Sequence, residues 1–265
     1  MIQEQLIARV RSVCEEDPGL SAALMYGSFA SGEADEYSDI EFWLFFTPRS
    51  RASLDPAAWC GRIAPVTHLL LNEFGTHVAF FPGLIRGEFH FAATDDMFSV
   101  RDWPARSGTV DRMILLDRTK ELAPILRALP ERAAAPGPGT TVEDLCGRFA
   151  NWLVLAHHTA ARGEYLRAWD ALGHVQRHLV WMARLAEHST VHWLTPSRCA
   201  EAELSPTALS ALRQATASAD PQELDSALRA AWRTGRDLWR VLLGEVGQLP
   251  PSSLVAELDA AFGAS

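Results

Sequence analysis

Two carboxylates spaced two residues apart are the first feature of this sequence that could do chemistry. Asp39 and Glu41 lie at the start of an apolar run that continues FWLFF. Side chains alternate between the two faces of a strand, so residues i and i+2 point the same way. Carboxylates held this close repel each other unless a cation lies between them. Because hard oxygen ligands suit Mg²⁺, which completes its shell with water and substrate phosphates, the pair predicts a metal site for phosphate chemistry.

A third carboxylate lies on another predicted strand, residues 84–91, which reads LIRGEFHF. Alternation puts Arg86 and Glu88 on the same face of this strand. If the strand pairs beside the one that follows Asp39, Glu88 completes an acidic triad, as a metal ligand or a general base. Arg86 is then a candidate phosphate contact, with a salt-bridge partner as the alternative. Glu73, which we expect on the neighbouring strand, is an alternative third acid.

A glycine–serine pair precedes the carboxylates in the chain. Gly27-Ser28 follows an apolar run that ends at Tyr26. Glycine lets the backbone approach a ligand closely, and free N–H groups at such a turn can hold phosphate oxygens. The Ser28 hydroxyl adds another donor. The pair is therefore a candidate nucleotide-phosphate contact.

The elements that must position these residues are short strands in the first half of the chain and helices in the second. Residues 133–141 read AAAPGPGTT, and two prolines and two glycines in this stretch predict a linker. Six β-rich runs with turn signals precede it, at 20–26, 40–46, 66–71, 76–81, 84–91 and 113–116.

Helical patterns fill the chain after the linker. Thr140 and Glu143 predict a capping box for a helix that runs to about residue 162, and a second helix is expected over about 164–188. Ser205-Pro206 and Asp220-Pro221 predict two further helix starts. We therefore expect an α+β protein with an N-terminal domain, 1–135, of mixed β-sheet and flanking helices. A C-terminal all-helical bundle, 140–265, should follow.

Composition restricts the class of function. Acidic residues number 33 and basic residues 24, which gives a net charge of -9 and argues against a nucleic-acid binder with a basic face. Lys120 is the only lysine, so arginine, backbone N–H groups, hydroxyls or metal must hold any phosphate. The N-terminus lacks a signal-peptide pattern, and no apolar run approaches the roughly 20 residues of a membrane span. Four cysteines without a C-x-x-C pair indicate reduced thiols, so we expect a cytoplasmic protein with no membrane partner.

Four segments together resemble a known enzyme family. MYGSFASGEADEYSDIEF, residues 25–42, is similar to the signature of the DNA polymerase beta nucleotidyltransferase superfamily, in which GS, a further glycine and SD-x-[DE] recur at these intervals. With NEFGTHVAFF (72–81), LIRGEFHF (84–91) and RGEY (162–165), the chain resembles the lincosamide nucleotidyltransferases, an antibiotic-resistance branch. The resemblance covers most of the first 100 residues and the C-terminal half more thinly.

The resemblance implies a reaction and a set of partners. A nucleoside monophosphate, usually AMP from ATP, is transferred to a hydroxyl of lincomycin or clindamycin, and pyrophosphate leaves. It implies Mg²⁺, with a two-ion site, and a homodimer whose helical domain serves acceptor binding and dimerisation. The acceptor is expected at the junction of the two domains. The implied residues are Asp39, Glu41 and Glu88 for catalysis and metal, Gly27, Ser28, Ser38 and Arg86 for the nucleotide, and Glu164 or Tyr165 for the nucleotide or acceptor.

Two other functions stay open from the sequence. The same chemistry could act on an aminoglycoside or another hydroxylated metabolite, which a net charge of -9 suits at least as well. A regulatory or toxin–antitoxin nucleotidyltransferase could act on a protein instead. His174/His178 and His188/His192 have the i, i+4 spacing of zinc ligands, but without an H-E-x-x-H pattern we do not expect zinc at either pair. For His157-His158, on the first helix after the linker, we expect a packed or capping role.

Overall fold

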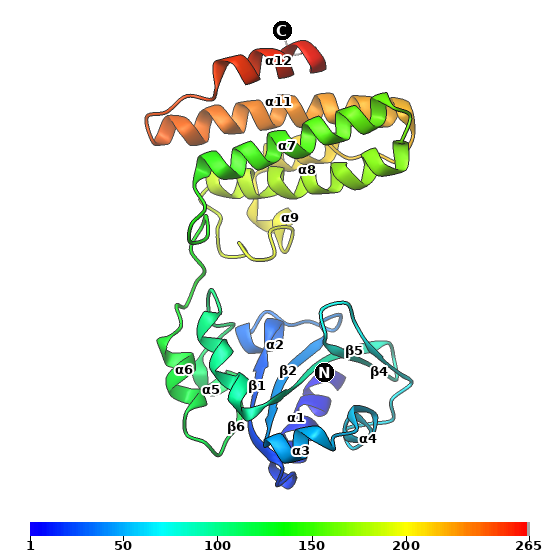
Figure 1. Ribbon diagram of the computed structural model, residues 1–265, viewed down its shortest axis with the longest axis vertical. Coiled ribbons are helices and arrows are strands. Elements are labelled where there is room, and N and C mark those ends of the chain that lie inside the picture. The colour runs from blue at the N-terminus through cyan, green and yellow to red at the C-terminus, as the bar shows by residue number, and fades with distance from the viewer. Residues whose placement is uncertain (264–265) are drawn as a thin grey trace. The chain divides into compact units, whose positions relative to one another are not determined.

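The computed structural model describes residues 1–263 and divides into two compact units (Figure 1). The first, Met1–Arg132, contains a β-sheet with helices around it. The second begins at Ala133 and contains helices but no strand among its described residues. The expected α+β fold with an all-helical C-terminal part is confirmed.

Six strands form one mixed sheet in the order β3-β4-β5-β2-β1-β6. Strands β2 and β5 pair in parallel, and the other neighbouring pairs are antiparallel. Each strand lies within two residues of its predicted bounds. The observed strands are β1 (Leu20–Tyr26), β2 (Ile40–Phe46), β3 (His68–Leu71), β4 (His77–Phe81), β5 (Ile85–Ala93) and β6 (Ile114–Asp117).

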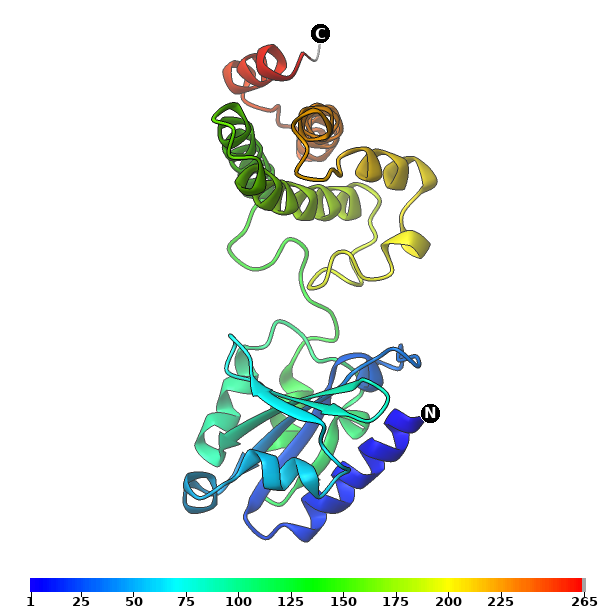
Figure 2. The ribbon, with the colours of Figure 1, turned by 90° about the vertical axis from the view of Figure 1, so that its right-hand side faces the viewer.

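Alternation along β2 separates an apolar face from a polar one. Ile40, Phe42 and Leu44 are fully buried, whereas Glu41 and Trp43 on the other face are partly exposed. Helix α1 (Ile2–Glu16) contributes its buried side to the same core cluster as the apolar face of β2. Figure 2 shows this helix lying along the sheet. The carboxylates therefore lie on the face of the sheet that is opposite to this core.

Short helices complete the first unit, and the segment after one of them covers part of the polar face. Trp103 follows η1 (Thr94–Asp102), and its ring centroid lies 5.6 Å from that of Trp43 and 5.9 Å from that of Tyr26. Trp103 therefore covers the polar face of the sheet beside β1 and the middle of β2, but it does not cover the start of β2. The remaining helices are α2 (Gly27–Ser31), α3 (Pro48–Ala52), α4 (Pro56–Gly61), α5 (Val110–Met113) and α6 (Leu122–Ala128).

The helices of the second unit begin at polar caps. Ser205 and Asp220 cap their helices as predicted, each with its side chain accepting backbone N–H groups. The predicted capping box was placed one residue too early, because the first long helix begins at Val142 and its box is Thr141 with Asp144. The helices are α7 (Val142–Ala161), α8 (Tyr165–Ala186), α9 (Ala200–Glu203), α10 (Pro206–Gln214), α11 (Pro221–Glu245) and α12 (Ser252–Phe262).

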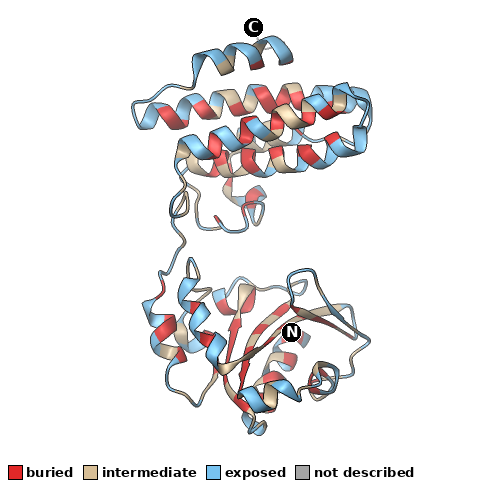
Figure 3. Cartoon of the chain, in the orientation of Figure 1, coloured by how far each residue is buried: buried red, intermediate tan, exposed pale blue. Residues whose placement is uncertain are grey.

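Buried residues along α7, α8 and α11 make most of the core of the helical unit (Figure 3). Phe149 of α7 and Trp232 of α11 are fully buried. The His174 ring stacks on Trp152 with centroids 4.0 Å apart, and His178 Nδ1 lies 2.7 Å from the His174 carbonyl oxygen. Among residues 1–263, no helix combines the length and apolarity needed to cross a membrane.

The close packing of α7 on α11 leads to a stability prediction. A Cβ on Gly235 would lie 2.1 Å from Cζ of Phe149, so Gly235→Ala should lower the free energy of unfolding by about 1–3 kcal/mol through overpacking. Gly173→Ala in α8 is the matched control, because its Cβ meets no atom within 4 Å and should raise stability by about 0.5–1 kcal/mol. Urea denaturation measures both. Equal stability of the two variants would contradict this packing.

Candidate active site

The strand register brings the candidate catalytic side chains to one level of the sheet. Glu41 of β2 is the direct parallel partner of Glu88 of β5, and Tyr26 of β1 is paired with Glu41 on the other side. Neighbouring strands lie about 4.8 Å apart, so these side chains are immediate neighbours on one face. Asp39 directly precedes β2 and is joined to Glu88 through Arg86. The condition set by the sequence, that strand 84–91 lies beside the Asp39 strand, is confirmed.

Arg86 bridges two of the three carboxylates. Its Nη1 donates to Asp39 Oδ2 and its Nη2 donates to Glu88 Oε1. Asp39 and Glu88 keep 31% and 18% of their side-chain surface exposed, and Arg86 keeps 40%, so the cluster lies at the surface rather than in the core. The structure therefore shows Arg86 in salt bridges, and its contact with a nucleotide phosphate stays a prediction. The guanidinium offsets the repulsion between carboxylates that the sequence predicted.

Gly27 provides the space for the carboxylate of Glu41. Its φ of +71° favours glycine, and a Cβ built on it would lie 1.5 Å from Glu41 Oε2. The Glu41 carboxylate therefore lies against the backbone at the start of α2. The glycine–serine turn and the acidic cluster form one site.

The two candidate serines have different surroundings. Ser28 is buried, and in the part of the chain that the structure describes its Oγ has no hydrogen-bond partner. Buried hydroxyls are nearly always hydrogen-bonded, so this donor fits a ligand at the Gly27-Ser28 turn. Ser38 Oγ instead donates to Asp35 Oδ1 at 2.9 Å and accepts the Asp35 N–H at 3.0 Å. Its hydroxyl shapes the loop that enters β2.

A hydrogen-bonded group beside Glu88 was not identified from the sequence. Tyr26 Oη donates to Glu88 Oε2 at 3.3 Å, and His90 Nε2 lies 3.1 Å from the same hydroxyl. Thr76 Oγ1 lies 3.1 Å from His90 Nε2. Burial, with the nearby charges of Glu41 and Glu88, raises the pKa of Tyr26 far above its usual value, so Tyr26 stays a protonated donor. The i, i+2 spacing from Glu88 to His90 was the available signal, whereas Tyr26 required the strand register.

The donor set fits a divalent cation by its chemistry. Asp39, Glu41 and Glu88 offer hard oxygen ligands on one face, beside the unpartnered Ser28 hydroxyl. Within residues 1–263, however, no group of three His, Cys, Asp or Glu side chains is arranged to hold a metal ion. In this structure Asp39 and Glu88 each accept a hydrogen bond from Arg86 instead. The two strand-start carboxylates, Asp39 and Glu41, remain the best candidates for metal ligands.

The other predicted residues lie elsewhere. Glu73 is exposed in the turn between β3 and β4, outside the strand row of Glu41, so by position Glu88 is the third carboxylate. Glu164 and Tyr165 belong to the helical unit, at the start of α8. The Glu164 carboxylate accepts a hydrogen bond from Arg167 at 3.0 Å.

The helical unit matches a known family. Residues 139–249 match the family described as lincosamide nucleotidyltransferase-like, C-terminal domain. The predicted resemblance to lincosamide nucleotidyltransferases is confirmed for the helical half of the chain, to which this match is limited. The match supports an antibiotic nucleotidyltransferase in general and leaves the antibiotic open. No curated protein matches the sequence of this chain.

Solved structures give weaker likenesses. An aminoglycoside 6-adenyltransferase from Bacillus subtilis aligns at 14% identity and a TM-score of 0.43, over 98% of this chain and 96% of that chain. A nucleotidyltransferase-like protein from Exiguobacterium sibiricum aligns at 15% identity and 0.36, over 99% and 89%. A CCA-adding enzyme in complex with ATP aligns at 11% identity and 0.34, over 97% and 72%. At TM-scores this low, these likenesses assign neither reaction nor substrate.

The bridging position of Arg86 leads to a prediction about metal affinity. Arg86→Met removes the positive charge between Asp39 and Glu88, so the protein without nucleotide should bind Mn²⁺ about tenfold more tightly. Titration followed by electron paramagnetic resonance measures the affinity. Arg106→Met is the matched control, because it breaks the ion pair with exposed Glu131 and should change nothing. Unchanged or weaker Mn²⁺ binding by Arg86→Met would contradict a cation site at these carboxylates.

Proposed function

We propose that this chain is a metal-dependent lincosamide nucleotidyltransferase. It transfers AMP from ATP to a hydroxyl of lincomycin or clindamycin, releases pyrophosphate and thereby inactivates the drug. The observation that carries the proposal is the convergence of three carboxylates beside the Gly27-Ser28 turn. The family match of residues 139–249 supports the lincosamide as acceptor.

The reaction places two demands on the site. The charge of the triphosphate must be offset, and the attacking hydroxyl must be aligned in line with the leaving pyrophosphate. Asp39 and Glu41 would hold Mg²⁺, with Glu88 as a further ligand or as the general base. When bound, the metal, as one ion or two, offsets charge on the phosphate oxygens. The Ser28 hydroxyl and the backbone at Gly27 donate hydrogen bonds to those oxygens.

In our proposal, Glu88 has the role of general base. It takes the proton of the acceptor hydroxyl as the new oxygen–phosphorus bond forms, and the bond from the α-phosphorus to the bridging oxygen of pyrophosphate breaks. Tyr26 donates to one of its oxygens and Arg86 to the other, which orients the carboxylate. Arg86 is also a cation within this cluster that can contact a bound triphosphate.

The helical unit has a supporting role in this proposal. Glu164 and Tyr165 at the start of α8 contact the acceptor or the nucleotide, with Tyr165 38% exposed. The same unit forms the interface of a homodimer. The substrates are small molecules, and the net charge of -9 speaks against nucleic acid as the acceptor.

The product assay tests the proposal. We expect the purified chain with clindamycin, ATP and Mg²⁺ to yield clindamycin enlarged by one adenylyl group, as detected by mass spectrometry. Asp39→Asn and Glu88→Gln should each lower kcat by about a thousandfold or more, because each removes a carboxylate that acts on the transition state.

Controls separate chemistry from folding in this assay. Glu36→Gln makes the same change at an exposed side chain and should leave kcat unchanged. Circular dichroism checks that every variant is folded. No adduct across a panel of lincosamides and nucleoside triphosphates would overturn the substrate, and a fully active Glu88→Gln would overturn the general base. Transfer to an aminoglycoside alone would establish the alternative acceptor.

A further inference from the structure

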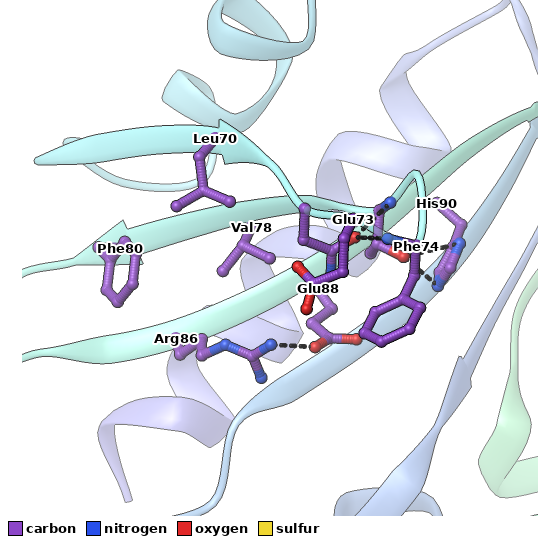
Figure 4. Close-up of a pocket in the computed structure, with 10 residues that line it drawn as sticks. Leu70, Glu73, Phe74, Val78, Phe80, Arg86, Glu88 and His90 are labelled. Atoms are coloured by element: carbon purple, nitrogen blue, oxygen red, sulfur yellow. Dashed lines mark hydrogen bonds and ion pairs between the residues drawn. The ribbon is translucent and has the colours of Figure 1, made fainter. Parts of the chain in front are cut away.

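A pocket of about 440 Å³ lies over the outer strands of the sheet, and Glu88 forms part of its wall (Figure 4). Its volume falls within the range of about 300–1,000 Å³ that is typical of small-molecule sites. The wall comes from β3, β4, β5 and the turn between β3 and β4. The pocket shares Thr76, Arg86, Glu88 and His90 with the site described above, and its other lining residues have no role in the reaction proposed there.

The pocket continues the strand row of the carboxylates. Val78 of β4 is the cross-strand partner of Glu88, and Leu70 of β3 is the partner of Val78. The row on one face of the sheet therefore runs from Glu41 through Glu88 and Val78 to Leu70. At a strand spacing of about 4.8 Å, the apolar residues begin one strand away from the proposed base. A ligand in the pocket thus reaches Glu88 without leaving this face.

Apolar side chains lie ready for contact in this pocket. Phe74 is 82% exposed and Leu70 is 37% exposed, and Phe80 contributes a further ring to the wall. The turn that carries Phe74 is ordered by Asn72, whose Oδ1 accepts the N–H of Phe74 at 3.0 Å and that of Thr76 at 2.9 Å. Phe74, Leu70 and Phe80 together give the pocket an apolar wall that a ligand can contact.

The charge of the pocket selects for a cation. Glu73 is exposed at the rim and forms no ion pair within residues 1–263, whereas Arg86 at the other side is already paired with Asp39 and Glu88. Figure 4 shows Glu73 and Phe74 at the end of the pocket where Glu88 lies. The rim therefore offers a carboxylate to an ammonium group, next to apolar surface and close to the base.

We propose that this pocket binds the acceptor, with its hydroxyl at Glu88, its ammonium group at Glu73 and its apolar portion on Phe74, Leu70 and Phe80. This inference rests on the proposed function and specifies its acceptor. The ligand must combine hydroxyls, a single amine and an apolar portion, as a lincosamide does. An aminoglycoside carries several ammonium groups and no apolar portion, so it leaves the apolar wall without a partner.

Two variants test the pocket in the full chain. Phe74→Ala should raise the KM for clindamycin about tenfold, because it removes the contact area of one aromatic side chain, while the KM for ATP stays unchanged. Glu73→Gln should raise the KM for clindamycin at least about threefold. Calorimetric titration of clindamycin, with Mg²⁺ and a non-hydrolysable ATP analogue present, should show matching losses of affinity. Phe74→Leu should recover part of the loss.

Matched controls and the contrary outcomes separate the two claims. Glu36→Gln and Phe98→Ala change an exposed acid and a partly exposed ring outside the pocket, and both should leave the KM for clindamycin unchanged. One contrary outcome is that the unmodified protein adenylylates clindamycin while Phe74→Ala and Glu73→Gln leave the KM and the affinity for clindamycin unchanged. This outcome would overturn the assignment of the pocket to the acceptor but not the proposed function. Transfer to an aminoglycoside but not to clindamycin would also overturn it. Failure of the unmodified protein to modify any acceptor would overturn the proposed function itself.

Discussion

Repulsion among three carboxylates is the constraint on which the rest of the site depends. The parallel pairing of β2 with β5 puts Glu41 beside Glu88, and Asp39 at the entrance to β2 adds a third negative charge. Such a cluster needs positive charge close by. In the protein as described, Arg86 supplies it by bridging Asp39 and Glu88. The proposed metal and the triphosphate rearrange this balance of charge, so nucleotide binding and the state of Arg86 are linked.

The apolar face of the sheet protects this arrangement. Ile40, Phe42 and Phe89 are fully buried on the opposite face and fix which residues of β2 and β5 point to the core. A slip of one residue in either strand would send a carboxylate into the core and a large apolar side chain to the surface, at a high cost in free energy. The hydrophobic pattern therefore specifies the position of Glu41 and Glu88 as strictly as any direct contact does.

The alternation of side chains made the strands and their faces predictable, since it depends only on neighbours in the chain. The sequence predicted an acidic triad only on the condition that β2 and β5 pair. It could not predict the pairing itself, because two helices and two other strands lie between them in the chain. For the same reason, the sequence could not predict the Tyr26–His90 contact or the bridging position of Arg86, since both depend on which strands are neighbours. The capping box was misplaced because Thr140 and Thr141 are both followed by an acid three residues later, and only the observed helix start distinguishes them.

The most direct test of the central claim is a crystal structure of the full chain with Mn²⁺ and a non-hydrolysable ATP analogue, with the metal located by its anomalous scattering. The account predicts Mn²⁺ bonded to carboxylate oxygens of Asp39 and Glu41, phosphate oxygens at Gly27-Ser28, and the Arg86 bridge between Asp39 and Glu88 opened. An ordered triphosphate bound elsewhere, with that bridge intact and no anomalous peak at these carboxylates, would contradict it.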